Sequence, residues 1–315
     1  MEASVSDAME RVKDIDDPVE QLLILHDYIA ENTVYNWEVA TDHRENAASY
    51  AWSAYGQLVE HDAVCKGIAM SYKLLVDRMN NPRIKCIVVP AQDKENPPVF
   101  DHVWNLVTID GQESYHVDVN KSINNVPTLR GKAAHTGFLL SDDKVKSMGY
   151  RKWVEGSPYD HIPVCDSTVY ESGFIFNDMN FPAYRRNGNY YYLKKTGYRK
   201  YSLYRGKNLK EGEFLAEIPL LTRDFDGKYY KISAGVVWRG NNLYYVDGNY
   251  NLAAYDLEKN LSVMIDKIPF EYKPSPDHIY DEDEDGIGLY FDEQSKCIVA
   301  VSRTRRCELK RWKVQ

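Results

Sequence analysis

The sequence predicts an α+β domain over residues 1–174, followed by an all-β antiparallel domain over residues 175–315. Three observations predict this division. Apolar residues recur at helical spacing before residue 80, an Asp-Gly hairpin signal stands near residue 110, and Tyr-rich alternating segments fill the chain after residue 180. A chain of 315 residues is long enough for two domains of common size.

Two helices are expected in the first domain. The stretch "DDPVEQLLILHDYIAEN" offers Asp17 as N-cap and Pro18 at the first helical position. A second helix is expected over residues 65–79, because apolar residues share one side of it and Pro82 prevents its continuation. His26 falls on the apolar face of the first helix, where we expect a core histidine with a local hydrogen bond.

Three strands are expected next, over residues 84–90, 102–109 and 114–119, the last two joined around Asp110-Gly111. A three-residue "DGQ" loop would pair position 102 with 120 and place Asp118 diagonally beside His102 on one face. A strict two-residue turn would pair 102 with 119 and turn Asp118 to the opposite face. The sequence leaves both registers open.

The C-terminal part is rich in tyrosine, of which the chain has 25. Its segments "NGNYYYLKK", "GNNLYYVDG" and "DGIGLYFDE" align at Tyr190, Leu243 and Leu289, with a spacing of roughly 50 residues that suits propeller-like blades. Three such units would not close a ring, so an open stack or sandwich of sheets is an equal alternative. Antiparallel β-structure is predicted in either case.

Composition limits the classes of partner. The net charge is -8 with basic residues scattered among acidic ones, so nucleic acid is not expected to bind. No run of 18 apolar residues predicts a membrane span, and Met1 to Asp14 do not resemble a secretory signal. A trimmed leader would leave the same chain, so an extracellular or cell-surface location stays open, as does the oligomeric state. Five cysteines without CxxC spacing predict neither a disulfide framework nor a zinc knuckle.

One cysteine stands at the start of a predicted helix. Cys65 would there receive the amides of the first turn, which stabilise a thiolate and offer donors to an oxyanion. His102 would supply an imidazole at the start of the predicted hairpin, and Asp118 a carboxylate that orients it. The three residues together predict acyl transfer through a thioester, and no fourth ligand suggests a zinc site.

Three motifs surround these residues, namely "YGQLVEHDAVCKGIA", "DHVWNLVTIDG" and "SYHVDVN". In this order they resemble the transglutaminase-like superfamily of papain-like thiol proteins, most closely its bacterial branch, over residues 15–165. The resemblance implies Cys65 as nucleophile, His102 as general base and then acid, and Asp118 as orienting carboxylate. It departs at "VNKS", where Asn120 and Lys121 replace groups that commonly line the cleft, so the substrate is not implied.

Three further residues are candidates for support of the reaction. The Cys65 amide is the first candidate for an oxyanion donor, and the side chains of Tyr55 and Gln57 are the second, with loop packing as an equal alternative. Trp104 is a candidate wall of the cleft, with a place in the core as its alternative.

An acidic run near the C-terminus suggests a cation site. In "DEDEDG", Asp281, Asp283 and Asp285 alternate before a glycine, as at the opening of a calcium loop. A solvated acidic turn is the favoured interpretation, because strands and not helices are expected on both sides. No other cofactor or metal is predicted.

The predicted function is that of a cysteine protease-like amidohydrolase or a transglutaminase. Its substrate would be a protein or peptide, for example a cell-wall peptide, whose peptide or isopeptide bond is cleaved or exchanged. The alternative is a non-catalytic transglutaminase-like scaffold whose β domain binds protein, glycan or cell wall. Exposed aromatic residues interleaved with Asn would suit that alternative.

Overall fold

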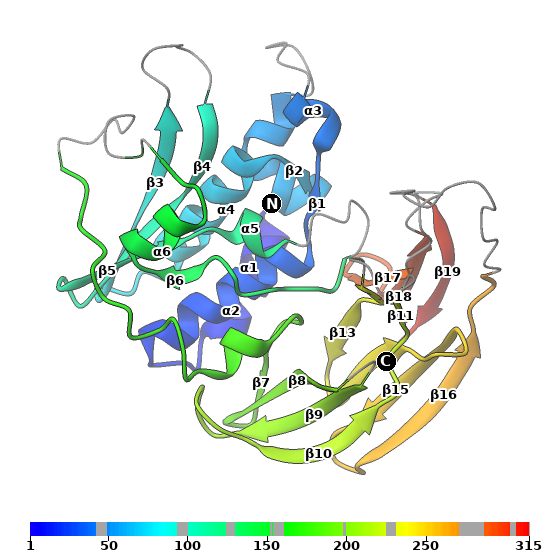
Figure 1. Ribbon diagram of the computed structural model, residues 1–315. Coiled ribbons are helices and arrows are strands. Elements are labelled where there is room, and N and C mark those ends of the chain that lie inside the picture. Colours follow the sequence, from blue (N-terminus) through cyan, green and yellow to red (C-terminus); the bar gives the residue numbers. More distant parts are fainter. Residues whose placement is uncertain are drawn as a thin grey trace.

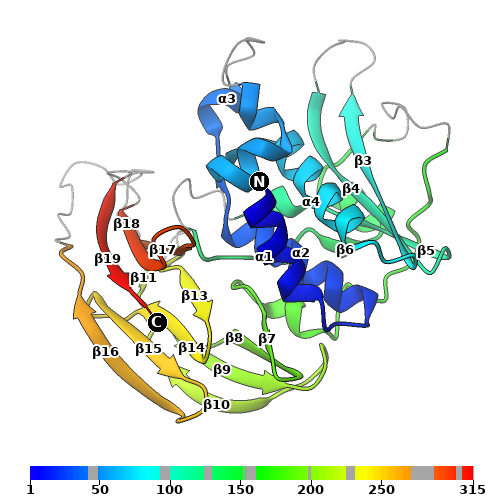
Figure 2. The same ribbon diagram turned by 180° about the vertical axis from the view of Figure 1, so that it is seen from behind.

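The computed structural model describes residues 1–41, 49–92, 100–123, 130–151, 153, 161–197, 200–224, 231–270, 287–302 and 307–314. Within these ranges the chain is α+β, with helices, a two-stranded sheet and a four-stranded sheet in the N-terminal half and several antiparallel sheets in the C-terminal half. Figures 1 and 2 show the C-terminal sheets gathered at one end of the molecule. No helix in the described ranges is long and apolar enough to cross a membrane.

The helices of the N-terminal half follow the sequence signals closely. The α-helices are α1 (Glu2–Val12), α2 (Pro18–Glu31), α3 (Trp37–Thr41), α4 (Cys65–Met79), α5 (Val119–Ser122) and α6 (Asp142–Ser147). Short helical turns are η1 (Ser49–Trp52), the π-helical η2 (Gly56–Glu60) and η3 (Ile175–Asp178). Both predicted helices are confirmed, because Asp17 accepts hydrogen bonds from the first-turn amides of α2 and α4 begins at Cys65.

A four-stranded antiparallel sheet, in the order β3-β4-β5-β6, packs against α4. Its strands are β3 (Ile84–Gln92), β4 (Phe100–Ile109), β5 (Glu113–Val117) and β6 (Phe138–Leu140). Ile109 pairs with Glu113 and Asn105 with Val117, so the β4–β5 loop has three residues. Of the two registers open from the sequence, this is the one that carries Asp118 toward His102. The strand predicted to end at residue 119 is β5, which ends at Val117 because Val119 begins α5.

The C-terminal half consists of short antiparallel sheets. The first contains β7 (Tyr184–Arg186), β8 (Asn189–Gly197), β9 (Lys200–Gly206) and β10 (Glu213–Ile218), and a two-stranded sheet follows with β11 (Thr222–Asp224) and β12 (Lys231–Ser233). The next contains β13 (Val236–Arg239), β14 (Asn242–Val246), β15 (Asn251–Asp256) and β16 (Leu261–Lys267). The last contains β17 (Ile287–Asp292), β18 (Cys297–Ser302) and β19 (Glu308–Lys313).

The predicted antiparallel β-structure is confirmed, and the three similar segments fall in three separate sheets, on β8, β14 and β17. The described strands form neither a closed propeller nor a closed barrel. Many tyrosines of these strands are core residues and not surface aromatics, including Tyr190, Tyr191, Tyr192, Tyr201, Tyr244, Tyr245 and Tyr255. Burial of these rings explains the tyrosine content as sheet packing.

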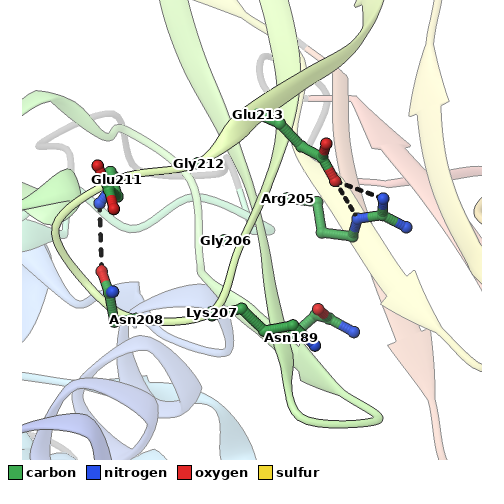
Figure 3. A pocket seen from close by; sticks show the side chains of 8 residues that line it. All are labelled: Asn189, Arg205, Gly206, Lys207, Asn208, Glu211, Gly212 and Glu213. Carbon is green, nitrogen blue, oxygen red and sulfur yellow. Dashed lines mark hydrogen bonds and ion pairs between the residues drawn. The ribbon is translucent and has the colours of Figure 1, made fainter.

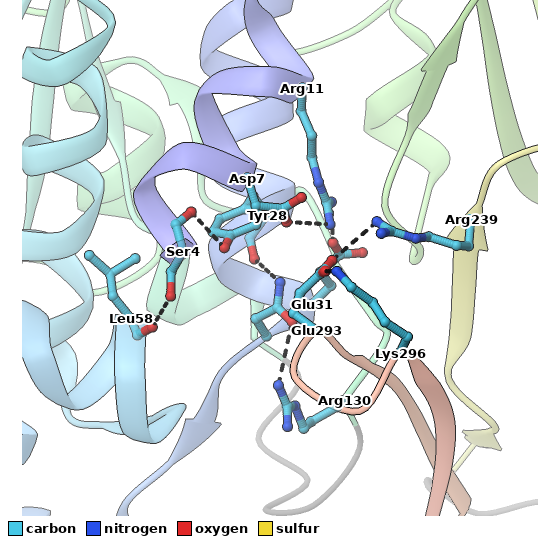
Figure 4. A network of polar contacts seen from close by, with 11 residues as sticks. Ser4, Asp7, Arg11, Tyr28, Glu31, Leu58, Arg130, Arg239, Glu293 and Lys296 are labelled. Atoms are coloured by element: carbon cyan, nitrogen blue, oxygen red, sulfur yellow. Dashed lines mark hydrogen bonds and ion pairs between the residues drawn. The ribbon is translucent and has the colours of Figure 1, made fainter. Parts of the chain in front are cut away.

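The two halves of the chain share one apolar core. Tyr190 and Tyr192 of β8 are buried in the same cluster as Leu22 and Leu23 of α2. A polar network adjoins this core, where Figure 4 shows Arg11, Glu31 and Glu293 gathered beside one another. Arg11 pairs with Glu31, and Glu293 in the β17–β18 turn pairs with Arg239 at 3.1 Å. The C-terminal sheets are therefore packed onto the N-terminal helices and not merely tethered to them.

Candidate functional site

Cys65 is the first residue of α4 and is partly exposed. The preceding N-cap residue, Val64, has an apolar side chain that gives the first-turn amides no acceptor. Gly67 lets another segment approach this turn, because a Cβ there would lie 2.4 Å from the carbonyl oxygen of Ala51. The thiol thus stands at an uncapped helix N-terminus, where donors for an anion are available.

Tyr35 lies beside Cys65, which the sequence did not indicate. The two-residue strand β1 (Val34–Tyr35) pairs in parallel with β2 (Asp62–Ala63), directly before the cysteine. The Tyr35 hydroxyl lies next to the backbone amide and the side chain of Cys65. Burial, reinforced by the nearby Cys65, raises the pKa of Tyr35, so the phenol keeps its proton at neutral pH.

His102 on β4 joins the thiol to a carboxylate. Its Nε2 lies 2.7 Å from Oδ2 of Asp118, and its ring lies close enough to Cys65 for that thiol to influence the pKa of the ring. Since Nε2 is taken by Asp118, Nδ1 is the ring nitrogen left for the thiol. Burial alone would lower the pKa of His102, but the charge and hydrogen bond of Asp118 and the nearby Cys65 raise it to about 10.

Asp118 is held on three sides. It is the N-cap of α5, with its Oδ1 accepting from the Lys121 amide at 3.1 Å. Its Oδ2 accepts from His102 and from the hydroxyl of Tyr150. Burial works to raise the pKa of Asp118, but the charge and hydrogen bond of His102 and the donors from Tyr150 and Lys121 lower it. Asp118 is therefore ionised, and its side chain is only 4% exposed against 23% for His102.

Trp104 forms a buried platform behind His102. The two rings stack with centroids 5.6 Å apart, and Trp104 is 1% exposed. Its Nε1 donates to Nδ1 of His116 at 2.9 Å, and Nε2 of His116 donates to Asp142 at 2.8 Å. The structure therefore places Trp104 in the core, and it offers almost no surface to a ligand.

Tyr55 and Gln57 lie on the approach to Cys65, but their side chains are engaged elsewhere. Tyr55 is 48% exposed and forms a side-chain hydrogen bond with Glu60. Gln57 is fully buried and donates from Nε2 to Thr33 at 3.2 Å. The hydroxyl that the structure brings to Cys65 is that of Tyr35 and not that of either residue.

The remaining cysteines have no such surroundings. All five thiols are free, with Cys86, Cys165 and Cys297 buried and Cys307 exposed. Burial raises the pKa of Cys86 to about 12 and also raises the pKa of Cys165.

Two groups of side chains have the residue types of metal ligands. Among the described residues these groups are His26, Asp27 and His135, all buried, and His116, Asp142 and Cys165, of which Asp142 is partly exposed. In the first group Asp27 Oδ1 lies 2.9 Å from His26 Nδ1 and 2.7 Å from His135 Nε2, so these atoms hydrogen-bond one another. The calcium loop suggested at Asp281, Asp283 and Asp285 lies outside the described residues.

Comparisons with known proteins add two distant structural likenesses. A crystal structure of a TGase is 17% identical with a TM-score of 0.32, covering 41% of this chain and 33% of that chain. The structure of Mycobacterium marinum arylamine N-acetyltransferase is 12% identical with a TM-score of 0.29, covering 84% and 86%. No protein-family model matches, and no curated protein matches. This chain therefore spans a third of the TGase, and the functional argument rests on the geometry given above.

Tyr35 and Tyr150 are the site residues that sequence reasoning missed. Both lie within residues 15–165, the range of the resemblance, but outside the three motifs quoted for it. Their hydroxyls contact Cys65 and Asp118. The available signal was that each is a polar residue inside the range of the resemblance.

A separate hollow of about 630 Å³ lies on the C-terminal half, around the β9–β10 turn. Figure 3 shows its lining, in which Arg205 and Glu213 form an ion pair. Its residues all fall between 189 and 213, so this hollow is distinct from the group around Cys65. Its chemistry is that of an open, charged surface turn.

Proposed function

We propose that this chain is a thiol-dependent acyl-transfer enzyme in which Cys65, His102 and Asp118 act as a catalytic triad on peptide or isopeptide amides. The observation that supports it is the short hydrogen bond between His102 and the buried Asp118, with Cys65 beside the same imidazole. A buried carboxylate beside an imidazole stabilises the imidazolium, and the imidazolium stabilises a thiolate.

The proposed reaction has two halves. The Cys65 sulfur attacks the amide carbonyl carbon and forms a carbon–sulfur bond, and the carbon–nitrogen bond breaks as His102 gives its proton to the departing amine. Water or a second amine then attacks the thioester, with His102 accepting its proton, and the thiolate is released. Water gives hydrolysis and an amine gives exchange, so the cysteine protease-like and transglutaminase activities differ only in the acceptor.

Tyr35 is the proposed partner of the oxyanion, together with the Cys65 amide. In the free protein the Tyr35 hydroxyl already contacts that amide. It must release the amide when a substrate oxygen arrives, and its protonated phenol can then donate to the same oxygen.

We expect Tyr35→Phe to lower kcat by about 100-fold with little change in KM, as loss of one oxyanion donor does elsewhere. A peptide library with a fluorescent amine acceptor gives the measurement once a substrate is found. The same change at the exposed Tyr55, Tyr55→Phe, is the matched control and is expected to have almost no effect. Equal losses in the two variants would contradict the role of Tyr35.

The test of the proposed function needs no known substrate. We expect iodoacetamide at pH 6 to modify Cys65 much faster than Cys307, because only a thiol ionised by an imidazole reacts well in acid. Peptide mass spectrometry assigns each site, and the exposed Cys307 serves as the internal comparison. Rapid modification of Cys65 should disappear in His102→Ala.

A result in which Cys65 and Cys307 react equally slowly at pH 6 would reject the proposed function. So would a fast reaction of Cys65 that His102→Ala leaves unchanged. Either result would favour the alternative, a non-catalytic module.

One observation favours that alternative. The edge strand β16 exposes four large apolar side chains, Leu261, Val263, Met264 and Ile265. Exposed apolar rows on edge strands are typical of surfaces that contact other chains. The predicted binding through exposed tyrosines has less support, since many tyrosines of this half are buried.

A further inference from the structure

A segment between Asp118 and β6 leaves the N-terminal half and returns to it. We name residues 130–137 the strap. At its end, the Asp118 amide donates to the Gly137 carbonyl at 2.7 Å. A Cβ on Gly137 would lie 2.2 Å from the Asp118 carbonyl oxygen, so the two backbones are in direct contact. The position of Asp118 is therefore tied to that of the strap.

The other end of the strap is held between sheets of the C-terminal half. The Val236 amide at the start of β13 donates to the Gly131 carbonyl at 3.0 Å. Gly131 has a positive φ of 82°, and a Cβ there would lie 2.5 Å from the Val236 oxygen and 2.7 Å from the Leu289 oxygen of β17. A Cβ on Gly235 would lie only 2.0 Å from the Arg130 carbonyl oxygen. Backbone thus meets backbone here with no room for a side chain.

Arg130 adds a side-chain anchor at this end. Its guanidinium lies over the Tyr290 ring of β17, 3.9 Å from the centroid. Its Nη2 also donates to Asn32 at the end of α2, at 3.4 Å. The strap thereby contacts both halves of the chain at one residue.

The middle of the strap is fixed by a buried polar cluster. His135 Nε2 lies 2.7 Å from Asp27 Oδ1, and His135 Nδ1 lies 3.2 Å from the Met179 carbonyl. Both ring nitrogens of His135 therefore face an oxygen atom that can accept a hydrogen bond. The Ala183 amide donates to the other oxygen of Asp27 at 2.7 Å. Residues 179 and 183 immediately precede β7, so the C-terminal half also holds this point.

We propose that the C-terminal β domain positions Asp118 through the strap, and so belongs to the catalytic apparatus. This inference rests on the proposed function of Cys65, His102 and Asp118. Asp118 orients His102 through one short hydrogen bond, and a displacement of about 1 Å in such a contact can cost about 100-fold in rate. The residues of β13 and β17 that contact the strap are positioning residues.

The decisive variant is Gly235→Ala in the full chain, because its methyl group would push the Arg130 carbonyl and shift the strap. With Asp118 displaced, the imidazolium of His102 loses support, and His102 then activates the Cys65 thiol less well in acid. We expect the rate of iodoacetamide reaction at Cys65 to fall about 10-fold to 100-fold at pH 6 and to approach the wild-type rate at pH 9. A change in the pH profile is a result that general destabilisation does not produce.

Gly248→Ala is the matched control, since a Cβ there meets nothing within 4 Å. It should keep the wild-type pH profile. Arg130→Met provides a milder disturbance if Gly235→Ala does not fold, as judged by circular dichroism, and it should shift the profile in the same direction.

The two proposals fail in different ways. If wild-type Cys65 shows no fast reaction at pH 6, the proposed function fails before the strap is tested. If the wild type reacts fast and a folded Gly235→Ala or Arg130→Met keeps its profile, the inference about the strap is overturned. A fall by the same factor at every pH would overturn it too, because that result indicates altered access and not altered ionisation.

Discussion

Asp118→Asn is expected to reduce the rate of Cys65 acylation by about 10³-fold to 10⁴-fold, the scale seen when a triad carboxylate becomes an amide. The carboxylate now accepts from His102 Nε2 at 2.7 Å and lowers the energy of the charged ring. An amide at this position carries no charge and can present its NH₂ group to the ring, which favours the wrong tautomer. Release of a chromophore from an aryl ester, in single turnover, measures the acylation step.

Asp142→Asn is the matched control for that experiment. Asp142 also accepts from a histidine, His116 Nε2 at 2.8 Å, but that pair lies behind Trp104. The same substitution there should lower the acylation rate by less than about 10-fold. It removes the hydrogen-bond acceptor of His116 behind Trp104, but it leaves the charges of the reacting groups unchanged. Equal losses in the two variants would mean that both carboxylates act only on folding, and the assignment of Asp118 would be wrong.

Cys65 and Asp118 differ in how far local sequence could place them. The start of α4 was predictable, since the helix signal begins at Cys65 and continues to Met79. The side of the sheet reached by Asp118 was not, because a change of one residue in the β4–β5 loop reverses it. Asp110 and Gly111 both take positive φ, and the Asp110 amide donates to Arg83 at 2.7 Å beside β3. This contact with the residue before β3 helps fix the conformation of the loop. It cannot be predicted from the sequence of the loop alone.

Tyr35 shows a second limit. It reaches Cys65 through β1 and β2, which are strands of two residues each and too short to have an alternating pattern. The three C-terminal sheets that contain the similar segments show a third limit. Their repeats were visible in the sequence, but the contacts that two of them make with the strap, at β13 and β17, were not. Such contacts join segments far apart in the chain, and periodicity carries no information on them.

The second large effect is expected at Asp27, which is buried and accepts from His26, His135 and the Ala183 amide. Asp27→Asn should lower the free energy of unfolding by about 3 to 5 kcal/mol, because it removes the buried carboxylate whose two oxygens face three hydrogen-bond partners. Urea unfolding at pH 7, followed by tryptophan fluorescence, measures this loss. Asp77→Asn is the matched control, since Asp77 pairs with Lys73 on the surface of α4 at 2.6 Å and should cost less than about 1 kcal/mol.

The pH dependence of the free energy of unfolding tests the contribution of the Asp27 carboxylate independently. Burial would raise the pKa of Asp27, but the charge and hydrogen bond of His135 and the donors from His26 lower it below the ordinary value of 3.8. A carboxyl with a depressed pKa contributes its stability above the unfolded value and loses it as the pH falls through the folded one. The difference in the free energy of unfolding between wild type and Asp27→Asn should thus have its full value at pH 7 and become smaller below pH 3.8. A gap that stays constant down to pH 3 would show that the substitution acts through packing, and the buried charge would then have no part in holding the strap.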